Sequence, residues 1–190
     1  MDDLNIEQQD FVTSLRSRSR GEIKALFRDC DPPELLKLRG EFKAMLLSQG
    51  NAMLDGIISR AFKLYGDWTG KAFCGTSETT GFGYNCFASK RGSIAKLFMD
   101  LRIGPSSWTS GDSMYLEYGH RNRGLIRWLE GEVRQAMPGV LLGFGSFGIK
   151  VGQRDKLRRR IPFLLYGPTA DFRFASDLEQ QNRGEVSAAA

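Results

Sequence analysis

Three charged residues near the middle of the chain, Glu130, Glu132 and Arg134, are spaced two apart. Side chains of an extended strand alternate between faces, so this spacing places all three on one face, together with Ile126 and Trp128. They could form a polar cluster inside a barrel, with Arg134 binding a ligand carboxylate and the two glutamates acting as acid and base. We prefer the simpler interpretation, a solvent-facing ladder of weak ion pairs.

His120 is the only histidine, and it follows Tyr118 on the same strand face. A general-base role needs an orienting acid, and Glu117 would point to the opposite face. We therefore expect His120 at a strand end that meets solvent. Glu130, Glu132, His120 and Tyr118 are catalytic candidates only if the protein is an enzyme. No metal site is expected, because one histidine and scattered cysteines supply too few ligands.

A glycine-rich segment, Gly143-Phe-Gly-Ser-Phe-Gly148, matches the dinucleotide pattern G-x-G-x-x-G. That pattern binds a pyrophosphate only where it follows a strand and opens a helix. The next residues, Ile149 to Asp155, do not have helical periodicity. We interpret these glycines as sites of bulges or close packing within a strand, and we expect no cofactor.

The net charge is +5, from 27 basic and 22 acidic residues, and the densest basic run is Arg154 to Arg160. In a hairpin loop this run could attract phosphate or an acidic partner, or keep a sheet edge soluble. It lacks the interleaved aromatic residues on which bases stack, so we do not expect nucleic-acid binding. Arg158–Arg160 and the N-terminal helices are the candidate surfaces for a protein partner.

The three cysteines, Cys30, Cys74 and Cys86, are widely spaced and odd in number. Their spacing favours a reducing compartment, either the cytoplasm or an organelle interior such as a plastid. No apolar run approaches the roughly 20 residues of a membrane-spanning helix, and the acidic start lacks a secretory signal. With 41% hydrophobic residues, the chain can build a substantial core.

The elements that would position these residues are mainly strands. Residues 125–149 predict a long hairpin, because Pro138-Gly139 is typical of a type II turn between two apolar runs. In residues 94–103, Leu97, Met99, Leu101 and Ile103 alternate with polar residues, as in a half-buried strand. Further strands are expected at 38–47, 68–73, 83–88, 113–120 and 161–166. Helices are expected at 5–29, at 35–38 and at 53–64.

This pattern predicts a mainly β (α+β) protein, an antiparallel barrel preceded by N-terminal helices. We assign residues 1–37 to a helical segment, 38–176 to the barrel domain and 177–190 to a disordered tail.

Five short segments occur in an order that resembles a known family. They are Leu38-Arg-Gly-Glu-Phe42, Trp68-Thr-Gly-Lys-Ala-Phe73, Leu116-Glu-Tyr118, Glu132-Val-Arg134 and Leu141-Leu-Gly143. The chain from 35 to 167 resembles the poorly characterised β-barrel proteins named for a GxWxG motif, in which W-x-G-K-x-F is the most specific segment. The resemblance implies a lipocalin-like, calycin-type barrel that holds an apolar small molecule, and it implies no particular reaction.

Aromatic residues on the expected strands suggest what such a barrel would contain. A closed barrel of about eight strands can hold a small ligand between apolar walls. The same side chains could instead fill the interior, and both interpretations fit the pattern. The candidate ligand-binding residues are Trp68, Phe73, Tyr84, Met99, Leu101, Leu116, Tyr118, Trp128, Arg134 and Phe144.

Three hypotheses of function follow. The first is non-enzymatic binding of an apolar or amphipathic molecule, such as a fatty acid, isoprenoid or pigment. The second is an isomerase or cyclase that acts on a hydrophobic substrate in the same cavity. The third is an accessory subunit that docks on a larger assembly.

Overall fold

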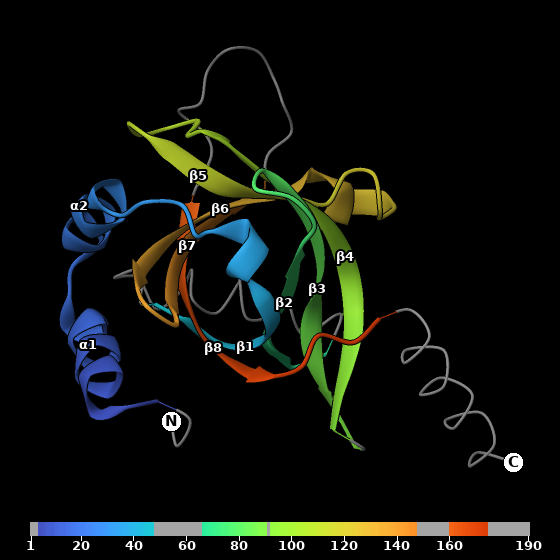
Figure 1. Cartoon of the computed structure of the whole chain (residues 1–190), viewed down its shortest axis with the longest axis horizontal. Helices are drawn as coiled ribbons and strands as arrows, with labels where there is room; N and C mark the ends of the chain where they lie inside the picture. The colour runs from blue at the N-terminus through green and yellow to red at the C-terminus, as the bar shows by residue number, and fades with distance from the viewer. Residues whose placement is uncertain (1–3, 48–65, 91, 148–159, 175–190) are drawn as a thin grey trace, which may run out of the picture.

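The computed structural model describes residues 4–47, 66–90, 92–147 and 160–174, and these form a closed antiparallel barrel of eight strands (Figure 1). Each strand pairs with its neighbour in the chain, and the first pairs with the last. The strands are β1 Arg39–Leu46, β2 Trp68–Gly75, β3 Thr80–Ser89, β4 Gly92–Pro105, β5 Asp112–Glu117, β6 Leu129–Met137, β7 Val140–Phe147 and β8 Arg160–Ala170. The mainly β, antiparallel barrel expected from the sequence is confirmed. The expected helix at 53–64, the tail at 177–190 and most of the basic run at 154–160 lie outside the described residues.

The central hairpin is the one that the sequence predicts. β6 and β7 pair up to Met137 and Val140, which leaves Pro138 and Gly139 as the turn. Gly139 has φ = +74°, a backbone conformation that glycine adopts without steric cost. Before this hairpin the chain forms a short 3₁₀-helix, η2 (Gly124–Trp128), where the sequence suggested strand.

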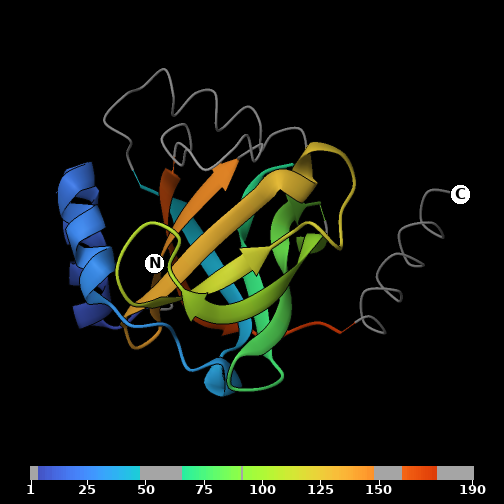
Figure 2. The same ribbon diagram turned by 90° about the horizontal axis from the view of Figure 1, so that it is seen from above.

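The barrel interior is a packed apolar core. Alternate residues of β4 point into it, as predicted: Met99 and Leu101 are buried, with Leu97 and Ile103 packed beside them. A second short 3₁₀-helix, η1 (Leu35–Lys37), closes one end and adds buried Leu35 to the core (Figure 2). The buried members of this core are Leu35, Leu38, Phe42, Phe73, Met99, Leu101, Met114, Leu116, Tyr118, Ile126, Leu129, Val133, Leu141, Phe163 and Leu165.

Two helices, α1 (Ile6–Ser17) and α2 (Arg20–Asp29), cover the outer face of the barrel beside β7 and β8 (Figure 1). The sequence suggested one continuous helix over 5–29. The break comes at Ser19, because Ser19 and Glu22 form a capping box that starts a new helix. Apolar residues of both helices, including Leu15 and Phe27, pack against Leu142 and other outward residues of the sheet. This part of the barrel therefore has a buried apolar cluster on its outer face as well as in its interior.

The glycine-rich segment is part of β7 as far as Phe147, so its described part opens no helix. Gly143 faces the ring of Phe163, and a methyl group at Gly143 would lie only 2.3 Å from the Phe163 Cζ atom. The interpretation of these glycines as sites of close packing is consistent with this contact.

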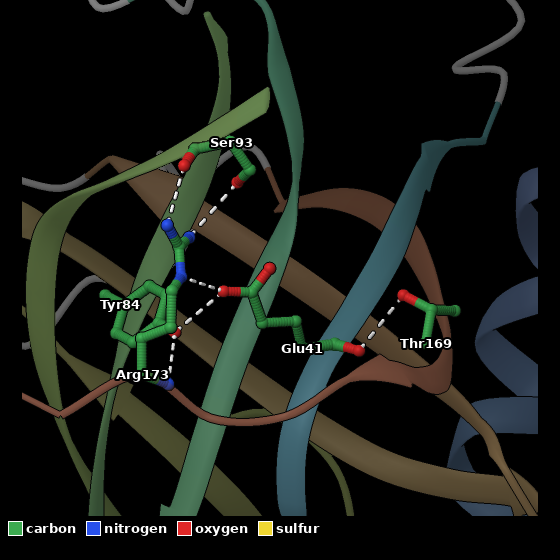
Figure 3. A network of polar contacts seen from close by, with 5 residues as sticks. All are labelled: Glu41, Tyr84, Ser93, Thr169 and Arg173. Carbon is green, nitrogen blue, oxygen red and sulfur yellow. Dashed lines mark hydrogen bonds and ion pairs between the residues drawn. The ribbon is translucent and has the colours of Figure 1, made fainter. Parts of the chain in front are cut away.

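The residues that follow β8 cross the outer face of β2 and β3. Phe172 packs with Tyr84, Cys74 and Cys86 in a separate apolar cluster. Next to it, Arg173 Nε donates to Glu41 Oε1 at 2.6 Å, and Arg173 Nη1 donates to the Ser93 carbonyl at 2.6 Å (Figure 3). The Tyr84 hydroxyl donates to Glu41 at 2.8 Å and accepts from the Arg173 amide at 3.0 Å. This network fixes residues 171–174 to β1, β3 and β4.

We expect Arg173→Met to lower the free energy of unfolding by about 1–3 kcal/mol, because Glu41 then loses its charged partner while only 12% of its side chain is exposed. The thiols of Cys74 and Cys86 should react roughly tenfold faster with a thiol reagent, because residues 171–174 would open more often. Urea unfolding and the thiol reaction rate check this. Arg121→Met is the matched control. The ion pair of Arg121 with Asp100 is also 2.6 Å long but is more exposed, so this substitution should lower the free energy of unfolding by less than about 1 kcal/mol. Equal losses in the two variants would contradict the prediction.

Candidate functional site

Three polar side chains lie inside the barrel, next to its apolar core. Lys71 is 5% exposed, Asn85 is fully buried and Tyr118 is 1% exposed. Each occupies an inward position of its strand: Lys71 shares its face with Phe73 on β2, and Tyr118 shares its face with Leu116 at the end of β5. The register of β2 and β3 pairs Lys71 with Asn85, and the closure of the barrel brings Tyr118 to them.

Hydrogen bonds link the three side chains into one cluster. Lys71 Nζ donates to Asn85 Oδ1 at 2.6 Å and to the Tyr118 hydroxyl at 2.7 Å. Asn85 Nδ2 donates to the Tyr118 hydroxyl at 3.0 Å and to the Leu97 carbonyl at 3.1 Å. Trp68 Nε1 donates to Asn85 Oδ1 at 3.1 Å. We call Lys71, Asn85 and Tyr118 the interior polar cluster.

Lys71 is a buried amine that forms no ion pair with any described residue. Desolvation by burial lowers its pKa from 10.5 to about 7, and the main counteracting influence is the nearby Cys86. The rings of Trp68, Tyr118 and Phe163, with centroids 5.2–5.5 Å from Nζ, give the ammonium form some cation–π stabilisation. Burial also raises the pKa of Tyr118, so its hydroxyl stays protonated.

A small cavity borders this cluster at the end of the barrel opposite η1. Its volume is about 30 Å³, room for roughly two water molecules. It is lined by Leu46, Trp68, Lys71, Leu116, Tyr118, Leu129, Glu130, Gly131, Gly145, Ile161 and Phe163. The lining is mostly apolar, and Lys71 and Tyr118 supply polar atoms at its wall. Toward η1 the interior is filled by Phe42, Phe73 and Met114.

The structure divides the ligand-binding candidates named from the sequence into three groups. Six belong to the interior core or pack against it: Trp68, Phe73, Met99, Leu101, Leu116 and Tyr118. Tyr84, Arg134 and Phe144 lie on the outer face, where residues 171–174 or the N-terminal helices cover them. Trp128 is 40% exposed in η2.

The catalytic candidates are also separated. Tyr118 lines the interior cavity, whereas Glu132 accepts hydrogen bonds from Ser106 and Ser107 on the outer face. Glu130 borders the cavity from β6, but it shares its strand face with Glu132, so its carboxylate belongs to the outer face. His120 is exposed in the turn after β5, as expected. Of the four catalytic candidates, Tyr118 alone therefore has its side chain in the interior polar cluster.

Arg134, proposed from the sequence as a ligand anchor, instead holds α2 against the barrel. Its guanidinium donates to the carbonyls of Phe27, Arg28 and Cys30 at the end of α2, and to Ser110 and Ser113 beside β5. These carbonyls form the negative end of the helix dipole, so the cation stabilises them.

Lys71 and Asn85 are the site residues that the sequence interpretation omitted. Both could have been found by extending the alternation of their strands: Lys71 is two residues before the inward Phe73.

The fold and the site define a closed eight-stranded antiparallel barrel with a polar cluster buried beside an interior cavity. No protein-family model matches the sequence, and no curated protein matches it. A solved structure, described as the crystal structure of a protein from Thermomonospora curvata, is similar with a TM-score of 0.54 and 17% sequence identity. The similarity covers 84% of this chain and 95% of that one. At this identity it shows the fold alone, and that fold is consistent with a lipocalin-like barrel.

Two further observations concern membranes and metal ions. Among the described residues, no helix is long and apolar enough to cross a membrane. The same residues contain no group of three or more histidine, cysteine or acidic side chains placed to hold a metal ion.

Proposed function

We propose that this protein binds an apolar or amphipathic small molecule at the end of the barrel opposite η1, with its polar end at the interior polar cluster, and carries out no chemistry on it. The observation that carries the proposal is the combination of an apolar cavity with a few polar groups in its wall, the usual composition of a small-molecule site. Fatty acids, isoprenoids and pigments have the required chemistry.

The size of the cavity constrains how such a molecule would sit. At about 30 Å³ it has room for a head group, and the packed side chains toward η1 exclude a longer chain. The apolar part of the ligand would therefore lie toward the barrel end formed by Leu46, Leu129 and Ile161, three apolar residues of the cavity wall. Kinship with the GxWxG-motif barrels belongs to this proposal, and its support is the motifs quoted above.

Native mass spectrometry of the purified protein, before and after solvent extraction, tests the proposal. We expect a bound molecule whose mass disappears on extraction. Gly145→Val should prevent its binding, because the added side chain enters the cavity, while the nearest contact of a Cβ at Gly145 is an ordinary 3.8 Å. A protein that carries nothing and binds neither octanoate nor octan-1-ol would contradict the proposal.

An isomerase or cyclase acting in the same cavity is the second candidate, because the Tyr118 hydroxyl and the Lys71 amine both lie at its wall. In that case Tyr118→Phe would abolish turnover of the substrate. A simple binding protein would show no turnover in either form.

A further inference from the structure

The interior polar cluster has more hydrogen-bond donors than acceptors. An ammonium group has three N–H donors, and Lys71 uses two of them, on Asn85 and Tyr118. The Tyr118 hydroxyl accepts from both Lys71 and Asn85, and its own hydrogen has no acceptor among the described residues. With Lys71 charged, one N–H and one O–H are thus left without partners at a buried site.

Unpaired buried donors and an unpaired buried cation are both costly. Asn85 cannot relieve this excess, because its oxygen already accepts from Trp68 and Lys71, and its amide donates to Leu97 and Tyr118. A group that only accepts hydrogen bonds and carries a negative charge would satisfy both donors and pair the cation. A carboxylate has these properties.

We propose that the polar end of the ligand is a carboxylate, bound between Lys71 Nζ and the Tyr118 hydroxyl. This inference rests on the proposed function and specifies its ligand as an organic acid with an apolar body. Because both donors belong to groups that line the cavity, the carboxylate reaches them from the same space that receives the rest of the molecule.

The titratable groups around Lys71 set the charge balance of this site. Tyr118 faces it from the end of β5, Cys86 lies on the neighbouring strand β3, and Glu130 borders the cavity from β6 with its side chain on the outer face. Burial keeps the first two neutral, since it raises the pKa of the Tyr118 hydroxyl and raises the pKa of the Cys86 thiol to about 12. The Glu130 side chain points away from the cavity, so Glu130→Gln should bind a carboxylate about as tightly as the natural protein.

Isothermal titration calorimetry with octanoate and octan-1-ol, which have equal chain lengths, tests the inference. We expect octanoate to bind at least tenfold more tightly. Lys71→Met should abolish this preference. Tyr118→Phe should lower the affinity for octanoate about tenfold and leave the affinity for octan-1-ol nearly unchanged. Tyr115→Phe is the control. The Tyr115 hydroxyl donates to the Pro105 carbonyl on the outer face, so this variant should bind both probes with the affinities of the natural protein.

A second readout separates a charge pair from simple filling of the cavity. Since the pKa of Lys71 in the empty site is about 7, the amine is mostly neutral at pH 8.5, and a bound carboxylate should recharge it. Titrations in buffers of different ionisation enthalpy should then show uptake of nearly one proton per octanoate and none for octan-1-ol. Equal affinities for the two probes without proton uptake would overturn the inference and leave the proposed function standing. Binding of neither probe, by a protein that also carries no extractable molecule, would overturn the proposed function itself.

Discussion

Replacing Arg134 with methionine is expected to lower the free energy of unfolding by about 3–5 kcal/mol, because several buried oxygen atoms lose their donor at once, each at about 1–3 kcal/mol before relaxation. Arg134 is 1% exposed and donates to five oxygen atoms, four of which are backbone carbonyls. Methionine would fill much of the space and satisfy none of them. Urea unfolding measures the loss.

The position of Arg134 also predicts where the damage appears. The carbonyls of Phe27, Arg28 and Cys30 end α2, so amide hydrogen exchange should accelerate first in α1 and α2 and only later in the barrel. Arg134→Lys should recover only part of the loss, since an ammonium has fewer donors and lacks the planar fork that spans both groups of acceptors.

Arg102→Met provides the control for Arg134. Arg102 also lies on a strand of the barrel, where it pairs with Glu117 at 3.1 Å, but its side chain is 46% exposed. Its removal should cost less than about 1 kcal/mol. If Arg134→Met were no more damaging than Arg102→Met, the guanidinium would not be what holds the helices to the barrel.

The strand pattern could be predicted from the sequence because alternation and turn chemistry are local. The β4 alternation of Met99 and Leu101 with polar residues and the turn at Pro138-Gly139 were both correct, and both follow from a few neighbouring residues. The direction of each face was harder to predict. Tyr84 and Phe144 are buried as expected, yet they lie outside the barrel.

The physical reason is that this barrel has two buried faces. Residues 171–174 and the N-terminal helices cover parts of the outer wall, so the covered strands carry apolar residues on both faces. Hydrophobic periodicity therefore cannot distinguish the inner face of these strands from the outer face. Glu132 and Arg134 were correctly placed on one face of β6. This face is the outer one because α2, about 100 residues away in the chain, supplies carbonyls to Arg134 there. Such a long-range contact cannot be inferred from neighbouring residues in the sequence.

Replacing Lys71 with methionine should stabilise the protein at neutral and acidic pH. Below pH 7 the folded chain must hold a buried ammonium that has no counter-ion among the described residues. Methionine removes that cost and orphans nothing: Asn85 Oδ1 keeps its bond from Trp68, and the Tyr118 hydroxyl keeps its bond from Asn85. At pH 6 we expect the variant to be more stable by several kcal/mol, with about 5 kcal/mol as an upper limit from the size of the pKa shift.

The sign of the pH dependence follows from proton binding. Between pH 7 and pH 10.5 the unfolded chain carries a proton on Lys71 that the folded chain has released, so the stability contributed by this group rises with pH across that window. The difference between Lys71→Met and the natural protein should therefore be largest below pH 7 and shrink toward pH 10. Urea unfolding of both proteins over this range measures it. Lys37→Met, at an exposed lysine paired with Glu34, should show no such trend.

A stabilising substitution at Lys71 would carry a further implication for the site. A buried residue that lowers the stability of a protein is commonly retained because the function of the protein requires it. If Lys71→Met gains stability at pH 6 and at the same time loses its preference for octanoate, the lysine is retained for the anion that it binds. If the variant is instead less stable across the whole pH range, Lys71 stabilises the fold through its two hydrogen bonds, and the case for a missing counter-ion fails.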